Sequence, residues 1–66
     1  MKTTILIWKH RMEKNLTLRD LSEMTNISRS ALNKYENNIV SPRLEQLAII
    51  ADALELNITD LFIVEK

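Results

Sequence analysis

The sequence predicts an all-α fold, a compact bundle of five short helices, on three observations. Apolar residues recur at helical spacings of three and four. Thr, Ser and Asn stand where they can cap helix N-termini, and further Asn residues stand where helices should end. No internal repeat or low-complexity segment interrupts this pattern. The expected helices span about residues 4–14, 18–25, 29–36, 43–54 and 58–63.

The second and third expected helices are joined by a turn of about four residues. Thr17 can cap the first of the two, and Asp20 completes a capping box, so that helix should begin at Leu18. It should end near Asn26, because Asn tolerates the left-handed backbone that follows many helices. Ser28 then caps the next helix.

The helix expected over residues 29–36 has two faces of different character. Its buried stripe should consist of Ala31, Leu32 and Tyr35. The outer face then carries hydrogen-bond donors and almost no apolar surface, and its residues are Arg29, Ser30, Asn33 and Lys34.

The last two expected helices close the core. Pro42 is compatible with the start of the fourth helix, because its missing N–H and fixed φ are tolerated in a first turn. Asn57 and Asp60 repeat the capping-box spacing before the fifth helix. The fourth helix should bury a stripe of apolar residues at helical spacing, namely Leu44, Leu47, Ala48, Ala51 and Leu54.

These motifs resemble a known family. The segment LTLRDLSEMTNISRS, residues 16–30, resembles the Leu-Thr, helix, turn and Val-Ser-Arg-Ser pattern of the phage-repressor and Cro family, often called XRE-type. Residues 35–37, Tyr-Glu-Asn, resemble the family's Ile-Glu-Asn-Gly ending, and residues 41–62 resemble its fourth and fifth helices. The resemblance covers residues 5–62.

The resemblance implies a single lambda-repressor-like DNA-binding domain over residues 1–66, with the helix-turn-helix at about residues 17–37. The chain departs from the family pattern because it has no glycine. Asn15, Asn26 and Asn38 stand at the usual glycine positions, and Asn still reaches the left-handed region. The chain path should therefore be preserved.

Composition excludes several classes of protein. A chain of 66 residues is one domain, and with no cysteine it has no disulfide, which fits a cytosolic protein. His10 is the single histidine and has no metal-ligand partners at suitable spacing, so half-buried packing is expected for it. No catalytic constellation, cofactor motif, signal peptide or membrane span is evident, so no enzyme, metal, cofactor, small-molecule ligand or membrane association is expected.

Net charge is zero, whereas a DNA-binding domain is usually basic. The charge is unevenly distributed, however. Residues 1–43 hold eight Lys or Arg against four Asp or Glu, a balance of +4, and residues 44–66 hold one against five, a balance of −4. A cationic face can still bind phosphate, with a shallower salt dependence than that of a strongly basic protein.

The resemblance implies a set of residues that contact bases in double-stranded DNA. The positions that match Arg29, Ser30 and Lys34 commonly contact bases in the family, and Asn33 is a fourth candidate. Arg29 suits guanine, Asn33 suits adenine, and Lys34 suits guanine or a phosphate. The alternative is an ordinary solvated helix face.

Phosphate contacts are expected on either side of the third helix. Leu18 stands where many family members carry a phosphate-binding Gln, so only its backbone N–H is available for that contact. For Arg43 the alternative is that it is simply a surface cation. For Asn37 and Asn38 the alternative is that they form the turn after the helix and do not contact phosphate. The full set is Leu18, Ser28, Asn37, Asn38 and Arg43.

The resemblance also implies a structural ion pair between Arg11 on the first helix and Glu36 at the end of the third. Such a pair would fix the recognition helix against the first helix. Because it should be semi-buried, loss of either partner should be more destabilising than loss of a surface ion pair.

The two chain ends carry more apolar residues than one small core needs. Ile5, Leu6 and Trp8 cluster near the N-terminus, and exposed clusters of this kind usually find a partner. We expect a homodimer on a palindromic site, formed through the C-terminal helix and tail (57–66). The alternative is that these residues only cap the core. The expected interface residues are Ile58, Leu61, Phe62, Ile63 and Val64.

Two functions are therefore predicted from the sequence. The first is a sequence-specific DNA-binding transcriptional regulator, a repressor, that reads the major groove with its third helix. The second is an antitoxin or accessory protein whose main role is to bind another protein. The neutral charge and apolar ends favour the second function, and the polar face of the third helix favours the first.

Overall fold

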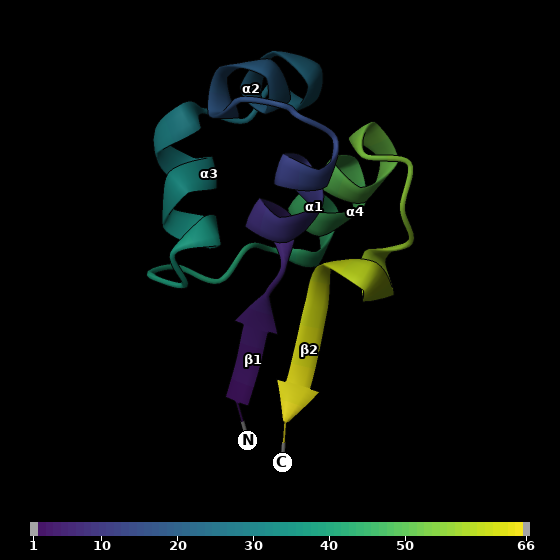
Figure 1. The fold of residues 1–66 in the computed structure, drawn as a ribbon. Coiled ribbons are helices and arrows are strands. Elements are labelled where there is room, and N and C mark those ends of the chain that lie inside the picture. Colours follow the sequence, from purple (N-terminus) through teal and green to yellow (C-terminus); the bar gives the residue numbers. More distant parts are fainter. Residues whose placement is uncertain (1, 66) are drawn as a thin grey trace.

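The computed structural model describes residues 2–65 and consists of four α-helices, one 3-10 helix and two strands within that range. In Figure 1, α2 lies at one end of the molecule, α3 flanks it, α1 and α4 occupy the middle, and the strands extend from the opposite end. The elements in chain order are β1 (Lys2–Ile5), α1 (Ile7–Glu13), α2 (Leu18–Thr25), α3 (Arg29–Glu36), α4 (Leu44–Ala53), η1 (Ile58–Leu61) and β2 (Phe62–Glu65).

The expectation of an all-α bundle of five helices was wrong at the two ends of the chain. β1 and β2 pair as an antiparallel two-stranded sheet, with Lys2 opposite Glu65 and Ile5 opposite Phe62. The first helix consequently begins at Ile7, and the fifth is a short 3-10 helix. Both strand segments are rich in Thr, Ile and Val, whose branched side chains fit a pleated strand better than a helix.

The two helices of the helix-turn-helix, α2 and α3, begin and end at the predicted residues, and α4 is one residue shorter than predicted at each end. The core takes fully buried side chains from nearly every element, including Ile7 of α1, Leu21 of α2 and Leu32 of α3. Leu61 of η1 closes it from the sheet end. Burying one such side chain contributes about 1.5–3 kcal/mol, so the helices are held mainly by this shared core.

The predicted core stripe of α4 was wrong at Leu44, and Ala48 is only half-buried. Leu44 is 68% exposed, because it begins the helix beyond the edge of the core. Ile50 is fully buried instead, and it lies on one helix face with Leu47, Ala51 and Leu54.

Three helices end in the same left-handed motif. Asn15 and Asn38 have φ of 57° and 59°, as predicted, and Glu55 has φ of 59° after α4. In each case the N–H of the left-handed residue and that of the following residue donate to carbonyls in the last helical turn; after α4, Glu55 N–H donates to Asp52 O at 3.1 Å and Leu56 N–H donates to Ala51 O at 2.8 Å. Asn26, at φ 63°, ends α2 as predicted. Glu55 was not anticipated, because Glu has no local preference for this region.

Candidate nucleic-acid interface

The start of α2 is fixed by the predicted capping box. The Thr17 hydroxyl accepts from the Asp20 N–H at 3.0 Å, and the Asp20 carboxylate accepts from the Thr17 N–H at 2.9 Å. The second of these bonds lowers the pKa of Asp20, because it stabilises the ionised carboxylate. The box leaves the N–H of Leu18, the first residue of α2, without an acceptor in residues 2–65.

The turn between α2 and α3 is held by side chains as well as by Asn26. The Ser22 hydroxyl donates to Ile27 O at 2.6 Å. The Thr25 hydroxyl donates to Leu21 O at 2.8 Å and accepts from Ile27 N at 3.3 Å. These bonds satisfy both main-chain polar groups of Ile27, in the middle of the turn. Sequence reasoning missed the Ser22 and Thr25 hydrogen bonds, although hydroxyl residues beside a turn are a recognisable signal.

The sequence-predicted base-contacting residues lie together on one side of α3. Ser28 caps the helix by accepting from Ala31 N at 3.1 Å. Leu32 and Tyr35 face the core, and Tyr35 also donates to Gln46 Oε1 of α4. The exposed side of the helix carries all four candidates, Arg29, Ser30, Asn33 and Lys34.

The cations of this surface are not neutralised. No carboxylate in residues 2–65 lies within ion-pair distance of Arg29, Lys34 or Arg43. By contrast, Arg19 on α2 pairs with Glu23 at 3.2 Å. The three unpaired cations are therefore available to an external anion.

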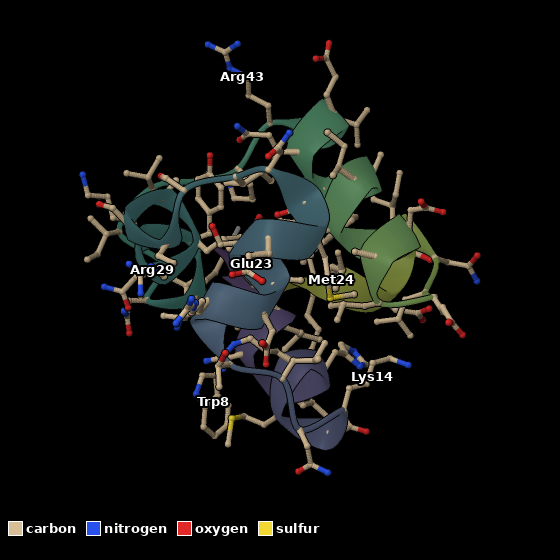
Figure 2. The ribbon with its side chains drawn as sticks, turned by 90° about the horizontal axis from the view of Figure 1, so that it is seen from above. Trp8, Lys14, Glu23, Met24, Arg29 and Arg43 are labelled. Atoms are coloured by element: carbon tan, nitrogen blue, oxygen red, sulfur yellow. The ribbon has the colours of Figure 1, made fainter. Side chains whose placement is uncertain are left out.

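Arg43 and Arg29 project into solvent from two different elements. Figure 2, which looks down on α2, shows Arg29 at the outer edge of α3 and Arg43 projecting from the start of α4, while Trp8 and Lys14 lie on the α1 side of the view, Trp8 nearer to Arg29. Arg43 occupies the N-cap position of α4 and makes no side-chain cap bond. Its side chain is exposed, as a phosphate contact requires.

The structure brings Asn37 and Asn38 to the end of α3 but engages both side chains internally. The Asn37 Nδ2 donates to two acceptors of Asn33, each at 2.9 Å, so it has no free donor for a phosphate. The Asn38 Oδ1 accepts from the Ile5 N–H of β1 at 3.1 Å. The predicted phosphate contacts of Asn37 and Asn38 stay predictions, and the Asn38 bond links α3 to the sheet.

Arg11 and Glu36 form a bidentate ion pair. Arg11 Nε lies 2.7 Å from Glu36 Oε2, and Arg11 Nη2 lies 2.9 Å from Glu36 Oε1. Arg11 Nη1 also donates to Leu16 O at 2.8 Å. Both side chains are nearly buried, at 9% and 4% exposed. The hydrogen bond with Glu36 raises the pKa of Arg11 above its ordinary value, although burial opposes the shift. This pair fastens the end of α3 to α1.

The residues predicted to form the dimer interface differ in how exposed they are to solvent. Leu61 is fully buried in the core of a single chain, so its assignment to an interface was wrong. Ile58 and Phe62 are half-buried against the core. Ile63 and Val64 on β2 are each 47% exposed.

The structure also describes the surroundings of the single histidine and allows a search of residues 2–65 for metal-ligand clusters and membrane-spanning helices. His10 is half-buried, and its Nε2 lies 2.9 Å from Asp60 O, which ties α1 to η1. No cluster of His, Cys, Asp or Glu in this range could hold a metal ion. None of the described helices is long and apolar enough to cross a bilayer.

Comparison with known proteins agrees with this geometry. Residues 9–61 match the helix-turn-helix family, and the chain belongs to that family, in its XRE-type class of DNA-binding domains. A protein of Methanobrevibacter smithii is 35% identical over 54 residues, which are 82% of this chain and 17% of that protein. One of Methanothermobacter thermautotrophicus is 37% identical over 49 residues, 74% of this chain and 16% of that protein. Both relatives are named "putative HTH-type transcriptional regulatory protein". The chain thus spans about a sixth of the length of either relative.

Proposed function

We propose that this chain is a sequence-specific DNA-binding transcriptional regulator, a repressor, that inserts α3 into the DNA major groove. One observation carries the proposal: the exposed face of α3 presents donors and unpaired cations on a helix that its neighbours hold rigidly. The names of the two relatives support a role in transcription.

Within this face, Arg29 and Ser30 open α3, and residues at the start of a recognition helix reach base edges. The Arg29 guanidinium has the fork that matches guanine O6 and N7, and Lys34 offers a point charge to guanine or phosphate. Each good bidentate pair contributes about 1–3 kcal/mol of discrimination.

Phosphate contacts would set the register of α3 in the groove. The free N–H of Leu18 at the start of α2 suits a phosphate oxygen, because helix N-termini favour anions. Ser28, just before α3, and Arg43, at the start of α4, would contact further phosphates. The +4 balance of residues 1–43 adds general attraction.

The test is binding to DNA from upstream of the gene and to a shuffled control, over a range of salt concentrations. The double variant Arg29→Ala, Lys34→Ala should lose the preference for upstream DNA, and its log–log salt slope should fall by about 2 if both cations contact DNA. Lys9→Ala, Lys14→Ala is the matched control, because it removes two exposed cations from α1 and its C-cap. Equal losses in the two double variants would contradict the assignment of α3.

We further propose that the protein acts as a homodimer on a palindromic site. Ile63, Val64 and Leu44 remain substantially exposed, at 47%, 47% and 68%. Val64 and Leu44 help to line a groove between the sheet and the start of α4, together with Thr3, Ile5, Ser41, Pro42, Leu47 and Phe62. A second copy would cover this apolar surface and present two recognition helices about 34 Å apart, one turn of DNA.

Sedimentation tests the dimer with two matched variants. Val64→Lys should shift the protein to a monomer at tens of micromolar, whereas Ile49→Lys on α4 should not, although the two side chains are 47% and 46% exposed. A wild-type protein that sediments as a monomer at this concentration would refute the dimer.

The second candidate is a protein whose main role is to bind another protein, as an antitoxin or accessory subunit does. It is favoured by zero net charge and by exposed apolar side chains on α1 and α2, where Trp8, Met12 and Met24 are 55%, 47% and 50% exposed. Absence of any DNA binding at low salt in the experiment above would make this function the leading one.

A further inference from the structure

Asn33 and Asn37 lie one helical turn apart at the exposed end of α3. The Asn37 Nδ2 donates to the main-chain oxygen of Asn33 at 2.9 Å and to Asn33 Oδ1 at 2.9 Å. Asn37 is itself held in place, because its N–H also donates to Asn33 O at 3.1 Å and its neighbours Glu36 and Asn38 are bonded to other elements. One amide at the helix end thus constrains the amide of a proposed base-contacting residue.

The chemistry of these groups fixes which way each amide points. A main-chain carbonyl only accepts hydrogen bonds, so Asn37 must present its nitrogen to it. That nitrogen only donates, so Asn33 must in turn present its oxygen. The Asn33 Nδ2 therefore lies on the other side of the amide, and it makes no hydrogen bond within residues 2–65. Asn33 offers solvent two N–H hydrogens.

We infer that this pair reads guanine in preference to adenine, with Asn37 as the positioning residue. The inference rests on the proposed DNA-binding function. Adenine pairs with an asparagine that accepts from N6 and donates to N7, but the bond from Asn37 uses one lone pair of the Asn33 oxygen and holds that oxygen toward the helix end, so the nitrogen faces outward. Guanine instead presents two acceptors, N7 and O6, to the two free hydrogens of Asn33. This revises the adenine preference that an unconstrained Asn33 would have.

The experiment begins by selecting binding sites for the full chain from randomised duplex DNA. Asn33→Ala identifies the base pair that Asn33 contacts, as the position whose preference is lost. The wild type should prefer guanine there. Asn37→Ala should lower the guanine-to-adenine affinity ratio at that position by about two- to fivefold, because it frees the Asn33 oxygen. A merely structural role for Asn37 would weaken all sites equally and leave this ratio unchanged.

Two further measurements keep the inference testable if Asn37→Ala folds poorly. With 7-deazaguanine at the same position, the wild type should lose affinity about fivefold and Asn33→Ala should not, because only N7 has been removed. Asn37→Asp, which cannot donate, should turn the Asn33 nitrogen inward and shift the preference toward adenine or cytosine.

The outcomes separate this inference from the function on which it rests. If the wild type selects no site, the DNA-binding function fails and the inference fails with it. If the wild type selects a site but prefers adenine at the Asn33 position, or if Asn37→Ala keeps the wild-type ratio, the function stands and the inference is overturned. The inference is likewise overturned if Asn33→Ala keeps the wild-type base preference at every position of the site.

Discussion

The helix-turn-helix region and the terminal sheet are held in different ways. In the helix-turn-helix region, residues 17–37, most side-chain hydrogen bonds join groups three to five positions apart, as between Thr17 and Asp20 or Ser22 and Ile27. In the sheet, Lys2 pairs with Glu65 and Ile5 with Phe62, across almost the whole chain. The first region is specified locally, whereas the second exists only once the rest of the protein has folded.

Of the side-chain interactions that join these regions to other elements, the Arg11–Glu36 pair should have the largest effect. Glu36→Ala should lower the free energy of unfolding by about 3 kcal/mol, because it leaves a nearly buried guanidinium without its carboxylate. Urea denaturation measures this. Glu23→Ala is the matched control, since it breaks an exposed pair and should change stability by less than about 0.5 kcal/mol. Equal effects would show that the region needs no long-range anchor.

The Asn38–Ile5 bond tests the link from the recognition helix to the sheet. Asn38→Gly keeps the left-handed backbone but removes the acceptor for the Ile5 N–H, and it should destabilise the protein by about 1 kcal/mol. Hydrogen exchange at Ile5 should accelerate. Asn15→Gly changes a residue of the same φ whose side chain makes no such bond, so it should leave Ile5 exchange as it is.

The capping box tests how far the helix-turn-helix region depends on local bonds. Thr17→Ala should lower stability by about 1 kcal/mol in thermal or urea denaturation. A smaller loss than that of Ser30→Ala, which removes an exposed hydroxyl with no cap bond, would contradict the role of Thr17.

The same box predicts a pH dependence with a definite sign. The pKa of Asp20 is lower in the folded state than in the unfolded state, chiefly because its carboxylate accepts from the Thr17 N–H. Its contribution is therefore present above the unfolded pKa and is lost as pH falls through the folded pKa. Stability curves of the wild type and Asp20→Asn should converge in acid and separate toward neutral pH. Parallel curves would refute the shift.

The smallest expected effect is a gain in stability. Glu55 adopts a left-handed backbone conformation that is unfavourable for Glu and favourable for Gly. Gly also gives the unfolded chain more conformational entropy, which opposes this gain, so Glu55→Gly should stabilise the protein by a net amount of about 0.5 kcal/mol. Asn15→Gly, at a residue that already tolerates this region, should give a smaller gain. Thermal denaturation of both variants decides the comparison.

The comparison explains what the sequence could predict. The bounds of α2 and α3, the Thr17 and Ser28 caps and the left-handed Asn residues all follow from neighbouring residues, and the structure agrees with them. The exposed positions of Arg29 and Lys34 also follow, because helical spacing separates them from Leu32.

The rest depended on contacts that no local pattern encodes. Residues 4 and 5 were expected in the first helix, but Thr4 and Ile5 lie in β1 because they pair with Ile63 and Phe62, more than 50 positions away. Leu44 has the spacing of a core residue but lies beyond the core's edge. The bonds made by Asn37 and Asn38 depend on side-chain orientations, which a residue type alone does not fix.

The antiparallel sheet also determines how this domain can be built into a longer protein. Because Lys2 lies opposite Glu65, the chain enters and leaves the domain at one point, at the end away from α2 (Figure 1). Adjacent ends of this kind let a domain be spliced into a loop of another protein, or be circularly permuted, with little distortion of either partner. A fusion at that point would leave the exposed face of α3 unobstructed.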